Sequence, residues 1–149
     1  MRSTRRKLRQ PRGKRRQYLV FISHSSSDRW IAQVIAEKIG ELGATCWFDE
    51  KDLEGGDVVV AEIIRGIDAC DEALVLISPP SVHSQWVAFE IGGVMAQHKR
   101  VTPILNNVTS DEMAPMKDIK GLELNRIDRF LVQLNSRIER MRKGQEYAL

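Results

Sequence analysis

Short apolar runs alternate with amphipathic stretches along most of the chain, beginning at Tyr18. Four apolar runs are predicted to be strands: 18–23, 44–48, 73–78 and 101–105. Of these, 18–23 and 73–78 have the composition of buried strands. A shorter strand is predicted over 122–125, ahead of a basic amphipathic helix from Ile127 to about Lys143. This alternation predicts a flavodoxin-like, doubly wound α/β domain, with a mostly parallel sheet flanked by helices.

The segments between the strands complete this pattern. The first helix is predicted to begin with Asp28 as its N-cap and to end at Gly43. Two further helices are predicted over 58–70 and about 82–99. Residues 49–57 hold five acidic residues and two glycines, which favours a surface loop. In a doubly wound sheet the loops that follow the strands meet at the carboxyl edge, where ligands bind.

Length and composition favour one ordinary domain. The chain has 149 residues, of which 42% are hydrophobic and 29% are charged. Nine Lys or Arg residues and no acidic residue lie in the first 17 positions, so the remainder carries 14 basic against 20 acidic residues. We therefore expect a basic, flexible arm over 1–17, a folded domain over 18–143 and a short tail over 144–149.

The basic arm allows two interpretations. It can act as a solubilising or linking segment, or it can make weak contacts with the phosphates of nucleic acid or of an anionic surface. Its lack of interleaved aromatic residues favours the first interpretation. No apolar stretch with the length of a secretory signal or a transmembrane segment follows it, so we expect a cytoplasmic protein.

Cysteines and histidines give little support to a metal site. Cys46 and Cys70 are the only cysteines, and their separation suits neither a metal cluster nor a disulfide framework, so both are expected to be buried and reduced. His24, His83 and His98 lack the paired spacing of metal ligands. A surface or helix-capping position is expected for each histidine.

The loop that follows the first strand, residues 23–28, reads SHSSSD. Its hydroxyls and backbone amides lie near a helix start, a setting that suits a phosphate or a ribose. Alternatively, residues 25–28 only cap the helix, and spacing alone favours that interpretation. The loop lacks the Gly-x-Gly-x-x-Gly pattern of dinucleotide dehydrogenases, so a hydride-transfer enzyme is not supported.

Trp86 and Glu90 stand four positions apart on a predicted helix, so their side chains share one face. An aromatic plane beside a carboxylate suits a flat, cationic ring attached to a ribose. Departure of that ring builds positive charge on the sugar, which an aligned carboxylate stabilises. Taken alone, this spacing is common, and a core tryptophan beside a solvated glutamate is the more frequent arrangement.

Four segments, taken together and in order, resemble the TIR (Toll/interleukin-1 receptor) domain family, bacterial NAD-cleaving type. YLVFISHSSSD is similar to the family's first conserved segment, and WFDEKDLEGGD is similar to the loop after its second strand. ALVLISPPSVHSQWVAFEIG resembles its third strand and active-site helix, and VTPIL resembles the next strand. The resemblance covers 18–143.

This resemblance implies a five-stranded parallel sheet of the TIR fold. In members that keep the glutamate it also implies NAD glycohydrolase or cyclase activity, with NAD as substrate, no separate cofactor and no metal. Glu90 matches the catalytic glutamate of the family, and Trp86 matches the tryptophan that precedes it. By the same matching, Phe21 and Ser23 are expected to line the nucleotide site, and Asp49 to lie at the base of the loop after the second strand.

The resemblance also implies partners. Active members complete the site across two protomers packed head to tail, so self-association is expected. A Thoeris-like antiphage system would place a separate effector downstream, which binds a cyclic ADP-ribose isomer. The alternative is a non-catalytic TIR adaptor that acts by self-association alone. Glu90, present in the matching frame, favours the enzyme.

Overall fold

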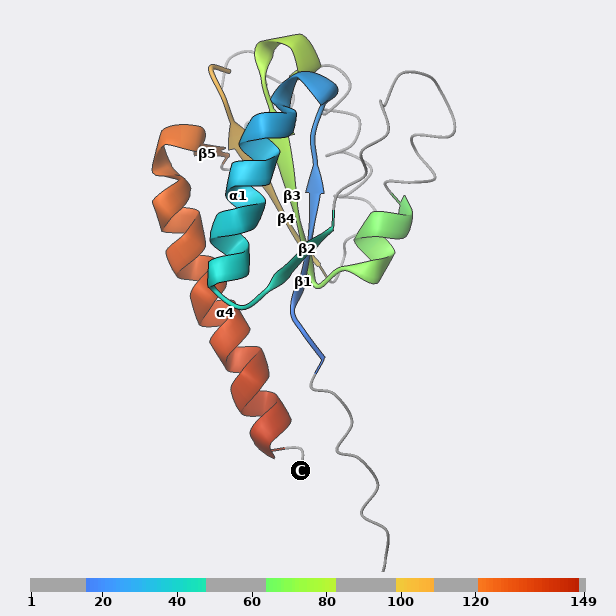
Figure 1. Cartoon of the computed structure of the whole chain (residues 1–149), viewed down its shortest axis with the longest axis vertical. Coiled ribbons are helices and arrows are strands. Elements are labelled where there is room, and N and C mark those ends of the chain that lie inside the picture. The colour runs from blue at the N-terminus through green and yellow to red at the C-terminus, as the bar shows by residue number, and fades with distance from the viewer. Residues whose placement is uncertain (1–15, 48–63, 83–98, 109–120, 148–149) are drawn as a thin grey trace, which may run out of the picture.

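The computed structural model describes residues 16–47, 64–82, 99–108 and 121–147 (Figure 1). Its sheet contains five strands, all parallel, in the order β2-β1-β3-β4-β5. Their bounds are Leu19–Ser23 for β1, Thr45–Trp47 for β2, Glu72–Ile77 for β3, Arg100–Leu105 for β4 and Leu122–Glu123 for β5. The doubly wound, mostly parallel sheet predicted from the sequence is therefore confirmed.

Helices cover both faces of the sheet (Figure 1). Helix α1 (Arg29–Glu41) and helix α4 (Ile127–Tyr147) lie on one face. A helical segment at 64–69 lies on the other face. None of the helices in the described part of the chain has both the length and the apolar character needed to cross a membrane.

The central strands β1 and β3 bury both of their faces, as expected for the middle of a parallel sheet. Alternate residues of β1 and β3 pack in one hydrophobic cluster with α1 and α4; the strand members are Val20, Ile22, Leu74 and Leu76. The intervening positions face the other way, where Phe21 and Ala73 pack with Ile67 and Cys70. Continuous apolar runs in the sequence reflect this burial on two sides.

A buried ionic network lies at the amino edge of the sheet. Glu72, the first residue of β3, is 1% exposed. Arg137 of α4 donates two hydrogen bonds to its carboxylate, from Nε at 2.6 Å and from Nη2 at 2.8 Å. The Tyr18 hydroxyl donates to the same carboxylate, and the Arg137 guanidinium lies 5.9 Å from the centre of the Phe130 ring. One side chain thus links the start of β1, the start of β3 and α4.

Several predicted boundaries can be compared with the structure. Gly43, with φ of +90°, follows α1 as predicted, because this left-handed conformation favours glycine. Helix α4 begins at Ile127 as predicted but continues one turn beyond Lys143, to Tyr147. The predicted strand 122–125 is shorter, since residues 124–126 form a 3₁₀ turn.

The cysteines are free, as predicted. Cys70 is buried, whereas Cys46 is only partly buried. Burial raises the pKa of the Cys46 thiol to about 12 and also raises that of Cys70, so both thiols are poor nucleophiles at neutral pH.

Residues Arg16 and Gln17, the end of the predicted arm, contact the domain. The Arg16 guanidinium pairs with the Asp71 carboxylate, and the Arg16 carbonyl accepts a hydrogen bond from Gln145 Nε2 at 3.2 Å. Gln17 accepts a hydrogen bond from the Thr45 hydroxyl. Residues 1–15, which carry the other eight basic residues of the arm, lie outside the described residues.

Candidate active site

The candidate site lies beyond the carboxyl ends of β1 and β3, two neighbouring strands in the middle of the sheet. From β1 the chain first crosses to β2 on one side and then returns past β1 to β3 on the other. This reversal is the topological switch point of a doubly wound sheet, where ligands bind. The loops that follow residues 23 and 78 meet there, as the sequence predicted.

A network of buried hydroxyls and one carboxylate connects these two loops. Ser78 Oγ donates to Asp28 Oδ2 at 2.5 Å, and Ser25 Oγ donates to the same oxygen at 3.2 Å. Ser81 Oγ lies 3.0 Å from Ser78 Oγ and accepts a hydrogen bond from the Ser78 amide at 2.9 Å. Asp28, Ser78 and Ser81 are each no more than 5% exposed. The loop after β1 is thereby fixed to the loop after β3.

The role predicted for Asp28 is corrected by this geometry. Asp28 does occupy the N-cap position of α1, but its side chain makes no capping hydrogen bond. Its carboxylate reaches across the edge of the sheet to Ser78 instead. The capping arrangement occurs at the other loop, where the side chains and backbone of Ser78 and Ser81 bond reciprocally around a 3₁₀ turn, Pro79–Ser81.

This turn is the last described structure before the segment that carries the predicted catalytic residues. Val82, which follows Ser81, is helical, and residues 83–98 lie outside the described residues. Trp86 and Glu90 fall in that segment. Asp49 also lies outside the described residues. The structure therefore describes where the chain enters the segment that holds Glu90, at the switch point.

Phe21 and Ser23, the two described residues of the predicted site, lie on the same face of β1. Ser23 is the last residue of the strand and is 4% exposed. The Phe21 ring is buried and packs against Trp47, with ring centroids 5.1 Å apart and ring planes tilted by 40°. Gly66, in the helical segment 64–69, packs tightly against both rings. A Cβ at this position would lie 2.6 Å from the Phe21 ring and 2.7 Å from the Trp47 ring.

Trp47 is a candidate site residue that sequence analysis missed. It is the last residue of β2, is 38% exposed and lies beside Phe21 in the strand register. Its position in a short strand suggested only a β-former. The available signal was its place near the carboxyl end of a predicted strand, two positions before the acidic segment 49–57.

A surface or helix-capping position was expected for His24, and the structure shows that it does not lie at the surface. It is 6% exposed, and its Nδ1 lies 2.8 Å from the Ser25 carbonyl oxygen, the geometry of an N–H donor to a carbonyl. The residue directly follows β1, where the packed loop encloses it. His83 and His98 lie outside the described residues. Among the residues that the structure describes, no group of three His, Cys, Asp or Glu side chains could hold a metal ion.

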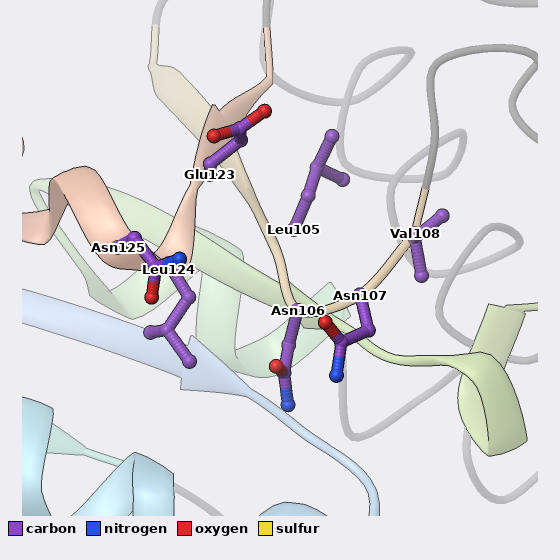
Figure 2. A pocket seen from close by; sticks show the side chains of 7 residues that line it. All are labelled: Leu105, Asn106, Asn107, Val108, Glu123, Leu124 and Asn125. Carbon is purple, nitrogen blue, oxygen red and sulfur yellow. The ribbon is translucent and has the colours of Figure 1, made fainter.

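A polar pocket of about 380 Å³ lies farther along the same edge, between the ends of β4 and β5 (Figure 2). Three amide side chains and one carboxylate supply its polar groups: Asn106, Asn107, Asn125 and Glu123. Figure 2 shows the Asn106 and Asn107 amides pointing to the same side of the loop. Asn107 has φ of +55°, which asparagine tolerates better than most residues. Such amides can hydrogen-bond to sugar hydroxyls or to a base.

Comparison with known proteins identifies the family. The family model described as "TIR domain" matches residues 20–136, which is most of the chain. The chain belongs to the TIR domain family. The predicted family and fold are thereby confirmed, and the switch-point loops described above belong to this TIR domain.

Two bacterial relatives illustrate the similarity. The 2' cyclic ADP-D-ribose synthase BtTIR of Bacteroides thetaiotaomicron is 35% identical over 103 residues, which is 66% of this TIR chain and 36% of that protein. The NAD(+) hydrolase TcpC of Escherichia coli O6:H1 is 25% identical over 103 residues, 65% of this chain and 34% of that protein. The chain thus spans about a third of the length of these relatives.

Solved TIR structures agree with the fold. A metazoan TIR-STING receptor from C. gigas in complex with 2',3'-cGAMP aligns with a TM-score of 0.58 and 26% identity, over 78% of this chain and 39% of that one. The TIR domain heterodimer of RPS4 and RRS1 aligns with a TM-score of 0.57 and 14% identity, over 87% and 97% of the two chains. At 14% identity, the second likeness concerns the fold alone.

Proposed function

We propose that this TIR domain cleaves the nicotinamide-ribose bond of NAD. The observation that carries the proposal is the 35% identity to a 2' cyclic ADP-D-ribose synthase across the TIR core. A second relative at 25% identity is an NAD(+) hydrolase. The switch-point location of the candidate site agrees with the proposal, because doubly wound folds bind nucleotides there.

In the proposed reaction, the bond between the nicotinamide nitrogen and ribose C1' breaks, and its electron pair leaves with neutral nicotinamide. The positive charge that develops on the ribose is stabilised by the Glu90 carboxylate, with Trp86 against the flat ring. Capture of C1' by water, with loss of a proton, gives ADP-ribose. Capture by a hydroxyl of the same molecule gives a cyclic ADP-ribose isomer.

The described residues have supporting roles in this proposal. Asp28 and Ser78 fix the start of the segment that carries Glu90. Ser23 ends β1 at the same edge, and the proposal assigns its hydroxyl to contact with a ribose or phosphate oxygen. Phe21 and Trp47 form an aromatic pair at this edge, and in the sequence Trp47 stands two positions before Asp49. NAD is the substrate, and the proposed chemistry uses no further cofactor.

Partners follow from the same proposal. We propose that protomers self-associate, with the segment 49–57 as a contact, and that the nucleotide product acts as a signal in antiphage defence. A downstream effector would then bind that product. A contact of the basic arm with nucleic acid or an anionic surface is compatible with this activity, and it predicts binding that weakens steeply with added salt.

The test is incubation of concentrated protein with NAD, with nicotinamide and nucleotide products separated by chromatography. Wild type is compared with Glu90→Gln, which keeps the shape of the side chain but removes its charge. Glu37→Gln, at an exposed position on α1, is the matched control. We expect Glu90→Gln to lower nicotinamide release by at least about 100-fold, as loss of a positioned charge does in other active sites.

The products and the control decide between the alternatives. Linear ADP-ribose identifies a hydrolase, and a cyclic isomer identifies a synthase. Equal turnover by wild type and Glu90→Gln would show that Glu90 is not catalytic. No turnover by wild type, even with a crowding agent that promotes assembly, would favour the non-catalytic adaptor.

A further inference from the structure

A second groove lies at the amino edge of the sheet, at the opposite end of the strands from the candidate active site. Its volume is about 400 Å³. Three arginines and two neutral polar residues line it, from β4 and α4: Arg100, Gln133, Ser136, Arg137 and Arg140. Among the described residues, no acidic side chain lines this groove.

The groove carries excess positive charge. Arg137 is paired with Glu72, so one of the three guanidinium charges is compensated. Arg100 lies opposite Glu72 in the register of β3 and β4, yet neither Arg100 nor Arg140 has an ion pair among the described residues. Three positive charges against one buried negative charge leave a net charge of +2. Like charges in one groove repel one another, and a bound anion relieves this repulsion.

The pairing with Glu72 also holds Arg137 in a defined geometry. Its Nε and Nη2 atoms donate to the two carboxylate oxygens, and the Phe130 ring lies 5.9 Å from its guanidinium carbon. The two N–H groups on Nη1 take no part in this bidentate pair. A guanidinium that is already immobilised loses little conformational entropy when it donates to a ligand.

We propose that this groove binds the phosphate group of a small phosphorylated molecule. The planar donors of arginine match the oxygens of a phosphate, and more than one arginine can share its two negative charges. The volume lies within the range of small-molecule sites, about 300–1,000 Å³, and exceeds the need of a single phosphate. Gln133 and Ser136 can hydrogen-bond to neutral parts of the same ligand.

This site is independent of NAD cleavage. Arg100 is the first residue of β4 and therefore lies at the amino edge of the sheet. The candidate active site lies beyond the carboxyl ends of β1 and β3. Five steps of about 3.3 Å along a strand separate the two edges. A ligand in the groove therefore occupies a separate site from a substrate at the switch point.

The test is isothermal titration calorimetry of the full chain with inorganic pyrophosphate, orthophosphate and AMP in separate titrations. Arg100→Gln and Arg140→Gln each remove one uncompensated charge. Arg142→Gln is the matched control, because Arg142 lies on the other side of the same helix, against Gly43. Arg137 is left unchanged to keep Glu72 paired. The basic arm is present in every protein, so its contribution is common to all titrations.

We expect saturable binding of pyrophosphate or AMP by wild type, weakened about tenfold by Arg100→Gln and by Arg140→Gln. Arg142→Gln should bind within about twofold of wild type. Thermal unfolding should be unchanged in all three variants, since these arginines are exposed. Equal affinity in wild type, Arg100→Gln and Arg140→Gln would overturn the proposal, because binding would then belong to diffuse charge or to the arm. Absence of saturable binding to any of the three probes would also overturn it.

Discussion

At the carboxyl edge of the sheet a buried carboxylate, Asp28, is met by the hydroxyls of Ser78 and Ser25, whereas at the amino edge a buried carboxylate, Glu72, is met by a guanidinium and a phenol. Both carboxylates join parts of the chain that are far apart in sequence. They differ in the charge of their partners. The Glu72 network contains a formal ion pair, and the Asp28 hydrogen bonds come from neutral donors.

This difference separates a structural anchor from an adaptable site. A buried ion pair is strongly coupled, because loss of either partner leaves a charge in the interior. Hydroxyl donors on short loop side chains are individually weaker and can exchange one partner for another. The rigid network therefore lies where β1, β3 and α4 are joined, and the weaker network lies where the candidate active site must admit a ligand. Three predictions test this contrast.

The largest effect is expected for Arg137→Ala. This substitution leaves the Glu72 carboxylate buried without its cation, which should reduce the free energy of unfolding by about 3–5 kcal/mol. Urea unfolding followed by circular dichroism measures the loss. Arg142→Ala, on the same helix at an exposed position, is the control and should change stability by less than about 0.5 kcal/mol. If the two variants are equally stable, Glu72 is not an anchor of the fold.

An intermediate effect on stability, and a larger one on activity, is expected for Asp28→Ala. Ser78 would lose its acceptor inside the domain, which should reduce the free energy of unfolding by about 1–3 kcal/mol. If NAD is cleaved as proposed, a shift in the chain that leads to Glu90 should lower nicotinamide release at least about tenfold. The free energy of unfolding and the rate of nicotinamide release are both measured at a temperature where every variant is fully folded without urea.

The control for this prediction is Asp68→Ala, an exposed aspartate in the helical region on the other face of the sheet. It should leave both stability and nicotinamide release near wild type. A stability loss for Asp28→Ala as large as that for Arg137→Ala would remove the contrast between the two networks. Full activity in a folded Asp28→Ala protein would show that the loop connection does not position the site.

The sequence predicted the fold well because burial restricts which residue types occur along each strand and helix. A strand buried on both faces must be apolar throughout, so the cores of β1, β3 and β4 were located to within about a residue. Alternation with helices then favoured parallel pairing and the doubly wound order. The end of α4 was predicted one turn too early, at about Lys143: the next residue is Gly144, a residue type that often ends a helix, yet the helix continues through it to Tyr147.

The two networks could not be predicted, because their partners are distant in sequence. Glu72 is separated from Arg137 by 65 positions, and Asp28 from Ser78 by 50. Asp28 was predicted as a helix cap because capping rules consider only the adjacent helix. In the folded domain, the Ser78 hydroxyl from another loop donates to its carboxylate instead. The resemblance to the TIR family identified Glu90 and Trp86 as candidates, while Trp47 was missed because a tryptophan in a strand is more often a core residue.

The smallest effect is expected for Tyr18→Phe, which removes one donor from the Glu72 network and keeps its ion pair. Loss of this hydrogen bond should cost about 0.5–1.5 kcal/mol near neutral pH. Burial, and then the hydrogen bond and charge of Glu72, raise the pKa of Tyr18 above its ordinary value. Below the ordinary value, about 10, both the folded and unfolded chains keep the phenol proton, and the shift has no effect on stability.

Above about pH 10 the unfolded chain releases this proton while the folded chain retains it, so wild-type stability should fall as pH rises. Phenylalanine cannot ionise, and the variant should therefore lose less stability than wild type between about pH 9 and about pH 11. Urea midpoints of wild type and variant at these two pH values measure the difference. Contributions from the other titrating groups are shared by both proteins and cancel in the comparison. Parallel loss in both proteins would mean that Tyr18 is not buried against Glu72, and the amino-edge network would then consist of the Arg137 pair alone.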